Sequence, residues 1–118
     1  MAIPSGFGTE TLKTGYFTVT TTAEEKIING SKHHIYTILS CTICNTAAAD
    51  KTFDLYIAKN GGNNDYEILS DVELKANKTF IFNDRLVLQE KDHLIFKANA
   101  SCDIDVIVSY IDQDWSTW

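Results

Sequence analysis

Apolar and polar residues alternate along the stretch from Lys32 to Lys59, and the rest of the chain is organised around this stretch. A period of two predicts strands with one buried and one exposed face, here two strands joined by a small polar turn. The buried face of the first strand is expected to hold Ile35, Leu39, Cys41 and Ile43. The buried face of the second strand is expected to hold Phe53, Leu55 and Ile57.

The same pattern recurs on both sides of this hairpin, in segments rich in β-branched and aromatic residues. Turn residues separate the segments at intervals of about 8 to 12 residues, and no segment has the 3.6-residue period of a helix. We therefore predict an all-β fold, an antiparallel β-sandwich of jelly-roll type, with a small closed barrel as the alternative. The further strands are expected at 15–22, 23–28, 66–74, 79–83, 86–88, 93–99 and 104–111.

The two ends of the chain depart from this pattern. Residues 1–14 have no sustained period and hold the only proline, so we expect an N-terminal arm, a sandwich domain over 15–112 and a C-terminal tail over 113–118. The arm is either a frayed terminus or a segment that orders against a neighbouring subunit. Both tryptophans lie in the tail, and Trp is enriched among interface anchors. Either Trp115 covers an open end of the sandwich or the tail docks into an adjacent subunit, and the second interpretation is preferred.

Composition limits the possible partners. The 118 residues suit one domain with one core, and the formal charge of −6 comes with basic residues that are scattered singly. A nucleic-acid surface needs clustered basic residues, so no nucleic-acid partner is expected. The chain has no apolar run of membrane-spanning length and its start lacks the pattern of a signal peptide, so we expect no membrane partner and synthesis in a cytosol.

The three cysteines do not predict a metal centre or a redox site. Cys41 and Cys44 form a CxxC motif, but residues three apart on a strand point to opposite faces and cannot share one ion. Cys102 is a possible neighbour of Cys41 across the sheets, and no disulfide can be deduced. We expect free thiols, no metal and no cofactor.

No catalytic constellation accompanies the strands. His33 and His34 are adjacent and point to opposite faces, and His93 also starts a strand, so we expect three solvated histidines rather than a base beside a nucleophile. Acidic pairs such as Asp103 with Asp105 suit an exposed strand face better than a calcium site or a glycosidase site. The chain is therefore not expected to be an enzyme.

The run from His34 to Asp112 resembles a class of small β-sandwich proteins of tailed bacteriophage particles. The resemblance lies in the order of the segments IYTILSCTICNTAAADKTFDLYI, a Gly/Asn loop, ILSDVELKANKTFIF and LVLQEKDHLIFKANASCDIDVIVSYI, which together cover about two thirds of the chain. The class implies a virion structural protein without enzymatic activity, most often a capsid decoration (cement) protein or a neck or tail accessory subunit. It carries over no catalytic residue.

From this resemblance we expect a homo-oligomer, plausibly a trimer, that binds the major capsid protein on the outer capsid surface of the virion after synthesis in the host cytoplasm. The arm and tail are expected to make the contacts. The expected partner-binding residues are Ile3, Pro4, Phe7, Trp115 and Trp118. The alternative is a carbohydrate-binding module with Tyr56, Tyr66 and the 60–65 loop at its site, and a hydrolase is the least favoured reading.

Overall fold

A computed structural model describes residues 9–62 and 64–115. These residues form nine strands and no helix, so none of them belongs to a helix long and apolar enough to span a membrane. The strands are β1 (Thr9–Val19), β2 (Glu25–Ile28), β3 (His34–Asn45), β4 (Lys51–Lys59), β5 (Asn64–Leu74), β6 (Thr79–Phe82), β7 (Leu86–Gln89), β8 (His93–Ala98) and β9 (Ile104–Asp114).

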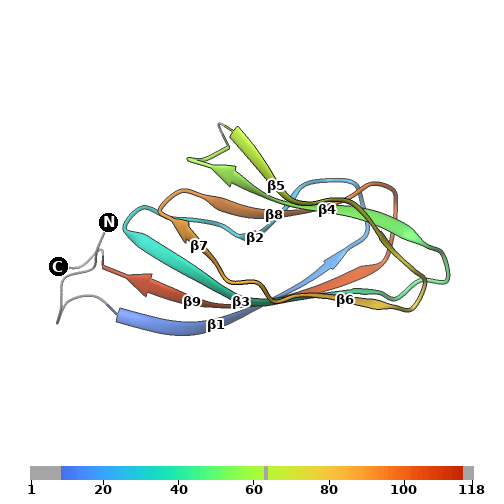
Figure 1. Ribbon diagram of the computed structural model, residues 1–118, viewed down its shortest axis with the longest axis horizontal. Helices are drawn as coiled ribbons and strands as arrows, with labels where there is room; N and C mark the ends of the chain where they lie inside the picture. The colour runs from blue at the N-terminus through green and yellow to red at the C-terminus, as the bar shows by residue number, and fades with distance from the viewer. Residues whose placement is uncertain (1–8, 63, 116–118) are drawn as a thin grey trace.

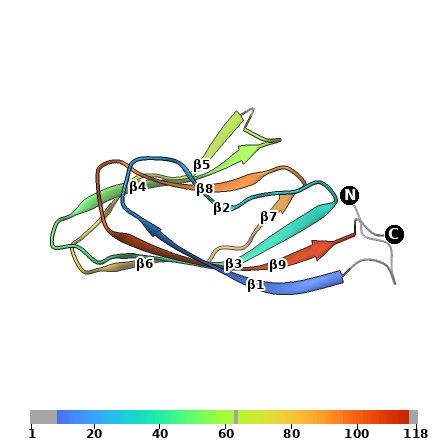
Figure 2. The same cartoon turned by 180° about the vertical axis from the view of Figure 1, so that it is seen from behind.

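The strands form two antiparallel sheets that pack face to face (Figures 1 and 2). One sheet has the order β1-β9-β3-β6, with β7 also paired to β3, and the other has the order β2-β8-β4-β5. Since β6 and β7 follow one another along the same edge of β3, they occupy a single position of an eight-position jelly roll. The predicted all-β sandwich of jelly-roll type is therefore confirmed.

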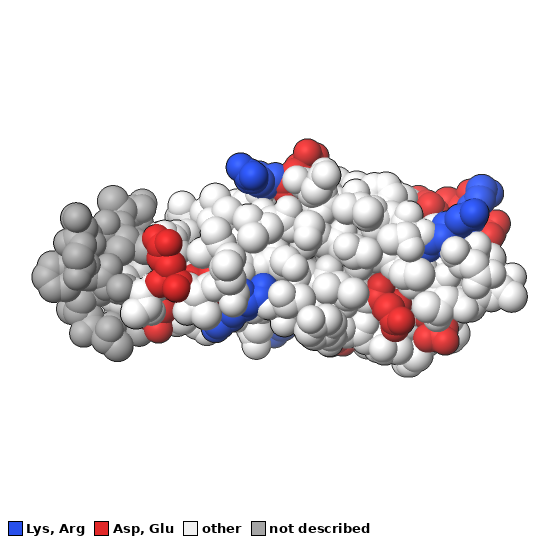
Figure 3. Space-filling view, turned by 90° about the horizontal axis from the view of Figure 1, so that it is seen from below, with Lys and Arg blue, Asp and Glu red and all other residues white. Residues whose placement is uncertain are grey.

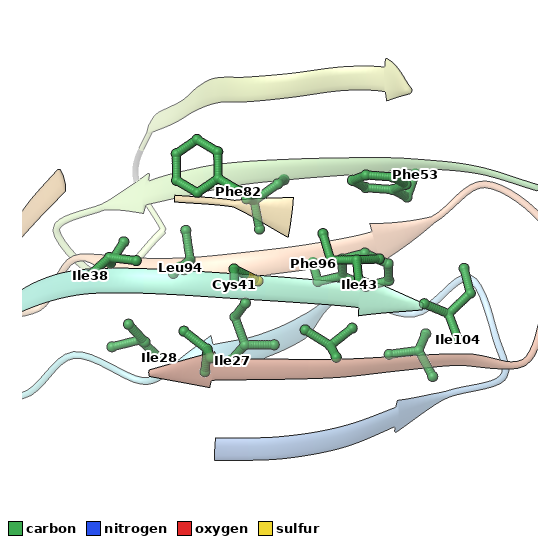
Figure 4. Packing of buried hydrophobic residues seen from close by; sticks show 14 of the residues in the cluster. Ile27, Ile28, Ile38, Cys41, Ile43, Phe53, Phe82, Leu94, Phe96 and Ile104 are labelled. Carbon is green, nitrogen blue, oxygen red and sulfur yellow. The ribbon is translucent and has the colours of Figure 1, made fainter. Parts of the chain in front are cut away.

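The core lies between the sheets and consists of the inward side chains of both (Figure 4). Phe53 of β4 and Phe96 of β8 are fully buried and stack with their ring centroids 5.3 Å apart. Alternation places Leu94 and Ala98 beside them, and Ile104 faces them from β9, as the sequence predicts. Each large apolar side chain of this kind contributes about 1.5–3 kcal/mol when it is removed from water.

Strand β3 contains a bulge that changes which residues are buried. Ile38 pairs with Tyr110 and Ser40 with Ser109, so Leu39 is an extra residue between two regular ladders. A single inserted residue shifts the alternation by one position. The buried residues are Tyr36 and Ile38 before the bulge and Cys41 and Ile43 after it. The prediction of a buried Ile35 and Leu39 was therefore wrong, while Cys41 and Ile43 are confirmed. The bulge lies where β6 gives way to β7 along this strand.

Strand β4 is buried on both faces. Phe53 and Leu55 are in the main core and Ile57 packs against it, which confirms the predicted inner face. On the outer face Tyr56 and Ala58 form a second, smaller cluster with Ile95 of β8. The Tyr56 hydroxyl donates a hydrogen bond to the Glu24 carboxylate, which comes from the connection between β1 and β2. This connection therefore helps to cover the outer face of the second sheet.

Strand β1 begins earlier than the sequence predicts. Pairing with β9 starts at Thr9 and continues without interruption to Val19, so Thr9 to Thr14 belong to the sheet and not to an arm. The side chains of Thr9 to Thr14 are exposed, which explains why this segment lacks the alternation of a half-buried strand. At the other end β9 continues to Asp114, two residues past the expected domain boundary.

Candidate interaction site at the terminal end of the sandwich

The first and last strands of the chain are neighbours, and this places both ends of the described chain at the same end of the sandwich. Thr9 of β1 is the register partner of Asp114 of β9. The molecule is elongated, with principal extents of 50 × 27 × 20 Å, so this end is one short side of a long body (Figure 1). We call it the terminal end. The segments 1–8 and 116–118 are covalently continuous with it.

A buried carboxylate organises the terminal end. Asp112 is 4% exposed, and alternation along β9 puts it on the inner face beyond Val108 and Tyr110. Its Oδ2 lies 2.8 Å from Lys13 Nζ of β1, and its Oδ1 lies 2.7 Å from His34 Nδ1 of β3. The hydrogen bond to Asp112 raises the pKa of Lys13. Three adjacent strands of the sheet, β1, β9 and β3, are therefore joined through one acidic side chain.

This Asp112 cluster, consisting of Lys13, His34 and Asp112, did not follow from the reading of the sequence. His34 was expected to be solvated, whereas its ring is half-buried and stacks on Tyr36 with a centroid separation of 5.7 Å. One signal was available: Asp112 continues the every-second-residue series of Ile104, Val106 and Val108. A position in phase with three buried residues is itself expected to face inward.

Trp115 packs on its own chain at the terminal end. Its ring stacks on His33 with the ring centroids 4.9 Å apart, and its backbone N–H donates to the His33 carbonyl at 3.1 Å. His33 has a φ of 68°, an uncommon conformation for a residue other than glycine. Trp115 thus packs on His33 of its own chain, and the docking of the tail into an adjacent subunit stays a prediction. The other expected partner-binding residues, Ile3, Pro4, Phe7 and Trp118, lie outside the described residues.

The two tyrosines expected at a carbohydrate site lie on opposite faces of their sheet. Tyr56 points outward and is 5% exposed, whereas Tyr66 is paired with inward-facing Ile57 and is 57% exposed. Tyr66 lines a shallow hollow of about 410 Å³ between the edges of the two sheets, together with Ile57 and Val87 of β7. Tyr56 and Tyr66 therefore do not share one ligand surface.

His93 is buried rather than solvated, contrary to the prediction. It is 7% exposed, and its Nδ1 accepts a hydrogen bond from the Gly30 N–H at 2.9 Å. Burial, reinforced by the positive charge of Lys26, lowers the pKa of His93. A neutral histidine whose Nδ1 already accepts from a backbone donor is a structural residue: from β8 it holds Gly30 of the β2–β3 connection in place.

The thiols and the acidic pairs show no convergent chemistry. The three cysteines are free, and burial raises the pKa of Cys41 to about 12, so its thiol stays protonated and unreactive. Cys44 lies on the opposite face of β3 from Cys41, as predicted. Asp103 and Asp105 are exposed, and Asp105 accepts a hydrogen bond from Thr18. Among residues 9–62 and 64–115, no group of three or more His, Cys, Asp or Glu side chains is placed to hold a metal ion.

The comparisons with known proteins support the fold. No family model and no curated protein sequence matches the chain. Among solved structures, it is similar to a chain of Bacillus endospore appendages, described as a family of disulfide-linked pili, with a TM-score of 0.59 and 10% identity over 98% of this chain and 97% of that one.

Chains from two structures of infectious bursal disease virus are also similar. The one from its T13 viral particle has a TM-score of 0.55 and 7% identity over 90% of this chain. The one from the Gx strain has a TM-score of 0.53 and 8% identity over 99% of this chain. The present chain spans only 31% and 38% of those longer proteins. At these identities the likeness is one of fold, a jelly-roll sandwich that also occurs in subunits of assembled particles.

Proposed function

We propose that this chain is a non-enzymatic structural protein of a virion, specifically a capsid decoration protein that binds the outer surface of the head and stabilises it. The observation that carries the proposal is the pairing of Thr9 with Asp114, which gathers both chain ends at one short side of a long, rigid body. The jelly-roll fold, which is similar to that of a chain from a viral particle, and the resemblance of the sequence to small bacteriophage virion proteins support the same function.

Attachment through the terminal end has a physical advantage. Two segments that leave a rigid body side by side reach the same patch of a partner, so binding of one raises the effective concentration of the other. The N-terminal segment contains Ile3, Pro4 and Phe7, and the C-terminal segment contains Trp118. Apolar anchors of this type offset the conformational entropy that a segment loses when it is ordered on a partner.

The Asp112 cluster gives this attachment a stiff base. Its two contacts, to Lys13 and His34, hold β1, β9 and β3 in register at the point where both terminal segments begin. Trp115, stacked on His33, holds the chain in place directly after the end of β9. A base of this kind transmits load from the terminal segments to the whole sheet.

We propose the major capsid protein as the partner and the capsid surface as the location.

The test uses particles purified from the virus whose genome encodes the chain. The full chain is added back to particles that lack it, in parallel with deletions of residues 1–8 and of 116–118, and bound copies are counted by quantitative mass spectrometry. Each deletion is expected to fold as the full chain does and to lose at least about tenfold in particle affinity. Binding in the hundreds of copies supports a decoration protein; a handful of copies, or binding unchanged by both deletions, would contradict it.

Tyr66→Ala is the matched control, because Tyr66 is exposed in the hollow beside Val87 and belongs to neither terminal segment. If the chain is a capsid decoration protein, this variant should bind particles as the unmodified chain does. If Tyr66→Ala alone abolishes attachment, and the chain binds to a glycan array, the carbohydrate-binding alternative replaces the decoration function.

A further inference from the structure

The outer face of the β1-β9-β3-β6 sheet is organised in rows that cross the strands. Register pairing aligns Tyr16 of β1 with Ile107 of β9, Ile107 with Thr42 of β3, and Thr42 with Ile81 of β6. We call this row the Tyr16 row. Tyr16 is 74% exposed, Ile81 59% and Ile107 38%, so the row presents apolar surface to solvent across the full width of the sheet.

A second apolar row crosses the same face. Leu12 of β1 pairs with Ile111 of β9, Ile111 with Thr37 of β3, and Thr37 with Val87 of β7. We call this row the Leu12 row; Leu12 is 74% exposed and Val87 is 56% exposed. Each strand position of one row has a counterpart of similar chemistry in the other. The Leu39 bulge keeps the two rows aligned on β3, because the extra residue lies between Thr37 and Thr42.

Between the two rows lies a row of small hydroxyl residues, Thr14, Ser109 and Ser40. Two polar rows lie outside the two apolar rows. Among the outward positions of the described strands of this sheet, only these polar rows hold charged side chains. In one, Glu10 accepts a hydrogen bond from Gln113, and in the other Asp105 accepts one from Thr18. The centre of the face therefore consists of apolar and hydroxyl side chains and is uncharged.

The space-filling view of this side of the molecule shows the uncharged centre, with acidic and basic groups gathered toward its margins (Figure 3). The outer face of the other sheet differs. Its outward positions include Lys26, Asp54, Asp65, Glu67 and Lys97. In a chain with a formal charge of −6, the centre of one broad sheet face thus carries no charged side chain. Exposed apolar area of this kind marks an interaction surface.

We propose that this face binds a second copy of the chain in a two-fold, face-to-face pair, with the axis running along the hydroxyl row. This axis places the Leu12 row of one copy on the Tyr16 row of the other. Leu12 then faces Tyr16, Ile111 faces Ile107, Thr37 faces Thr42 and Val87 faces Ile81, and each contact occurs twice, as an isologous interface requires. The hydroxyl row faces itself.

The charged rows are compatible with the same axis. The two outer polar rows face each other, so Glu10 of one copy lies over Thr18 of the other and Asp105 lies over Gln113. No carboxylate is placed directly opposite another. Two copies with a charge of −6 each repel one another in most orientations, and this orientation brings together the faces that add least to that repulsion.

The size of the face suits a stable pair. Strands of 11 residues, spaced about 4.8 Å apart and rising about 3.3 Å per residue, give a four-strand face of roughly 700 Å² per copy. A standard interface buries about 800 Å² per partner. Aligned sheets of this composition pack about 10 Å apart, as the two sheets within a sandwich do. A second copy therefore matches the face in area and in chemistry.

This pairing is independent of the attachment proposed above, since it uses the sheet face and leaves the terminal end open. It replaces the trimer expected from the sequence with a two-fold unit. Because the axis reverses the strand direction, the two terminal ends lie at opposite ends of the pair.

The test measures self-association of the full chain by sedimentation velocity, without any particle. The unmodified chain is expected to form a dimer of twice the 13.2 kDa chain mass at micromolar concentration. Leu12→Glu and Tyr16→Lys each place a charge against apolar partner atoms and should weaken the dimer at least about tenfold. Both side chains are 74% exposed, so both variants should fold like the unmodified chain, and circular dichroism is the check.

Mixing the two variants tests the axis itself. Leu12 faces Tyr16 only across the proposed two-fold, so a mixture of Leu12→Glu and Tyr16→Lys chains should form a heterodimer with an affinity within about threefold of the unmodified dimer. Glu67→Lys and Lys26→Glu, on the outer face of the other sheet, are the matched controls and should leave the dimer unchanged. A monomeric unmodified chain at about 100 μM, dimers unaffected by both variants, or a mixture that stays monomeric would each overturn the proposal.

Discussion

The Oδ1 of Asp112 in β9 lies 2.7 Å from the Nδ1 of His34 in the adjacent strand β3, although the two residues are 78 positions apart in the sequence. The pair lies on the inner face of the sheet at the terminal end, and Lys13 of β1 binds the other carboxylate oxygen of Asp112. A buried carboxylate is tolerated in a sandwich only when donors surround it in this way. The contact is thus a determinant of both stability and shape at the terminal end.

Replacing Asp112 with Asn should destabilise the fold by about 1–3 kcal/mol, because the amide cannot accept from Lys13 and His34 as the carboxylate does. Urea denaturation followed by fluorescence measures this change. Asp105→Asn is the matched control on the same strand, since Asp105 is exposed and has one hydrogen bond from Thr18. The control should stay within about 0.5 kcal/mol of the unmodified chain. Equal effects of the two changes would contradict the role given to Asp112.

Acidification should destabilise the fold through His93. Its folded-state pKa lies below the ordinary value of 6.5, so the unfolded chain takes up the proton first. The stabilisation is fully present above pH 6.5 and declines as the pH falls below that value, until the folded-state pKa is passed. Protonated Nδ1 also loses its role as acceptor for the Gly30 N–H.

His93→Asn keeps an acceptor at this position and removes the titrating group. The free energy of unfolding, measured at intervals from about pH 7 down to pH 5, should fall less steeply with acidification for the variant than for the unmodified chain. Identical slopes would show that His93 does not contribute to the pH dependence.

Asn45 is a fully buried polar residue at the end of β3, and its side chain organises the turn into β4. Its Nδ2 donates to the carbonyls of Ala49 and Leu74, and its Oδ1 accepts from the Ala47 N–H. Asn45→Ala should cost about 2–4 kcal/mol, because three backbone groups lose their partner. Asn99→Ala removes an exposed amide and should cost less than about 1 kcal/mol. Thermal unfolding of both variants provides the comparison, and a similar loss in both would argue against Asn45 as the organising residue.

Gly30 lies against the turn between β7 and β8, where no side chain fits. A Cβ at this position would lie 2.0 Å from the Asp92 carbonyl oxygen and 2.4 Å from that of Glu90. Gly30→Ala should therefore shift the backbone and cost about 2–4 kcal/mol, measured by chemical denaturation. Gly61→Ala is the control for loss of a glycine in open space: its added Cβ meets nothing within 4 Å, and its positive φ should cost about 1 kcal/mol. A milder effect at Gly30 than at Gly61 would contradict this assignment.

The alternation of side chains was enough to predict the sandwich and most of its core, since Phe53, Phe96 and Val106 follow a period of two that only a strand explains. It failed where one inserted residue changed the phase, as at Leu39, because nothing in the local sequence marks a bulge that is set by the partner strands. It also failed for Thr9 to Thr14, whose exposed side chains conceal a fully paired backbone.

The candidate site was less predictable than the fold for a related reason. His93 was expected at the surface, and no buried position was predicted for Asp112. Their burial depends on donors supplied by Gly30, Lys13 and His34, which are distant in sequence. The two apolar rows on the outer sheet face were hidden in the same way. They become visible only when the register aligns four strands.

The neighbouring placement of Thr9 and Asp114 determines how the molecule responds to mechanical force. Pulling the two ends away from each other would peel β1 from β9 one hydrogen bond at a time, which is the weakest way to load an antiparallel ladder. When both ends are held together on one surface, a force applied at the far end of the body is instead shared by β1 and β9, two neighbouring strands of one sheet. The same strand order therefore makes a chain that unzips easily in isolation and resists detachment once both ends are held.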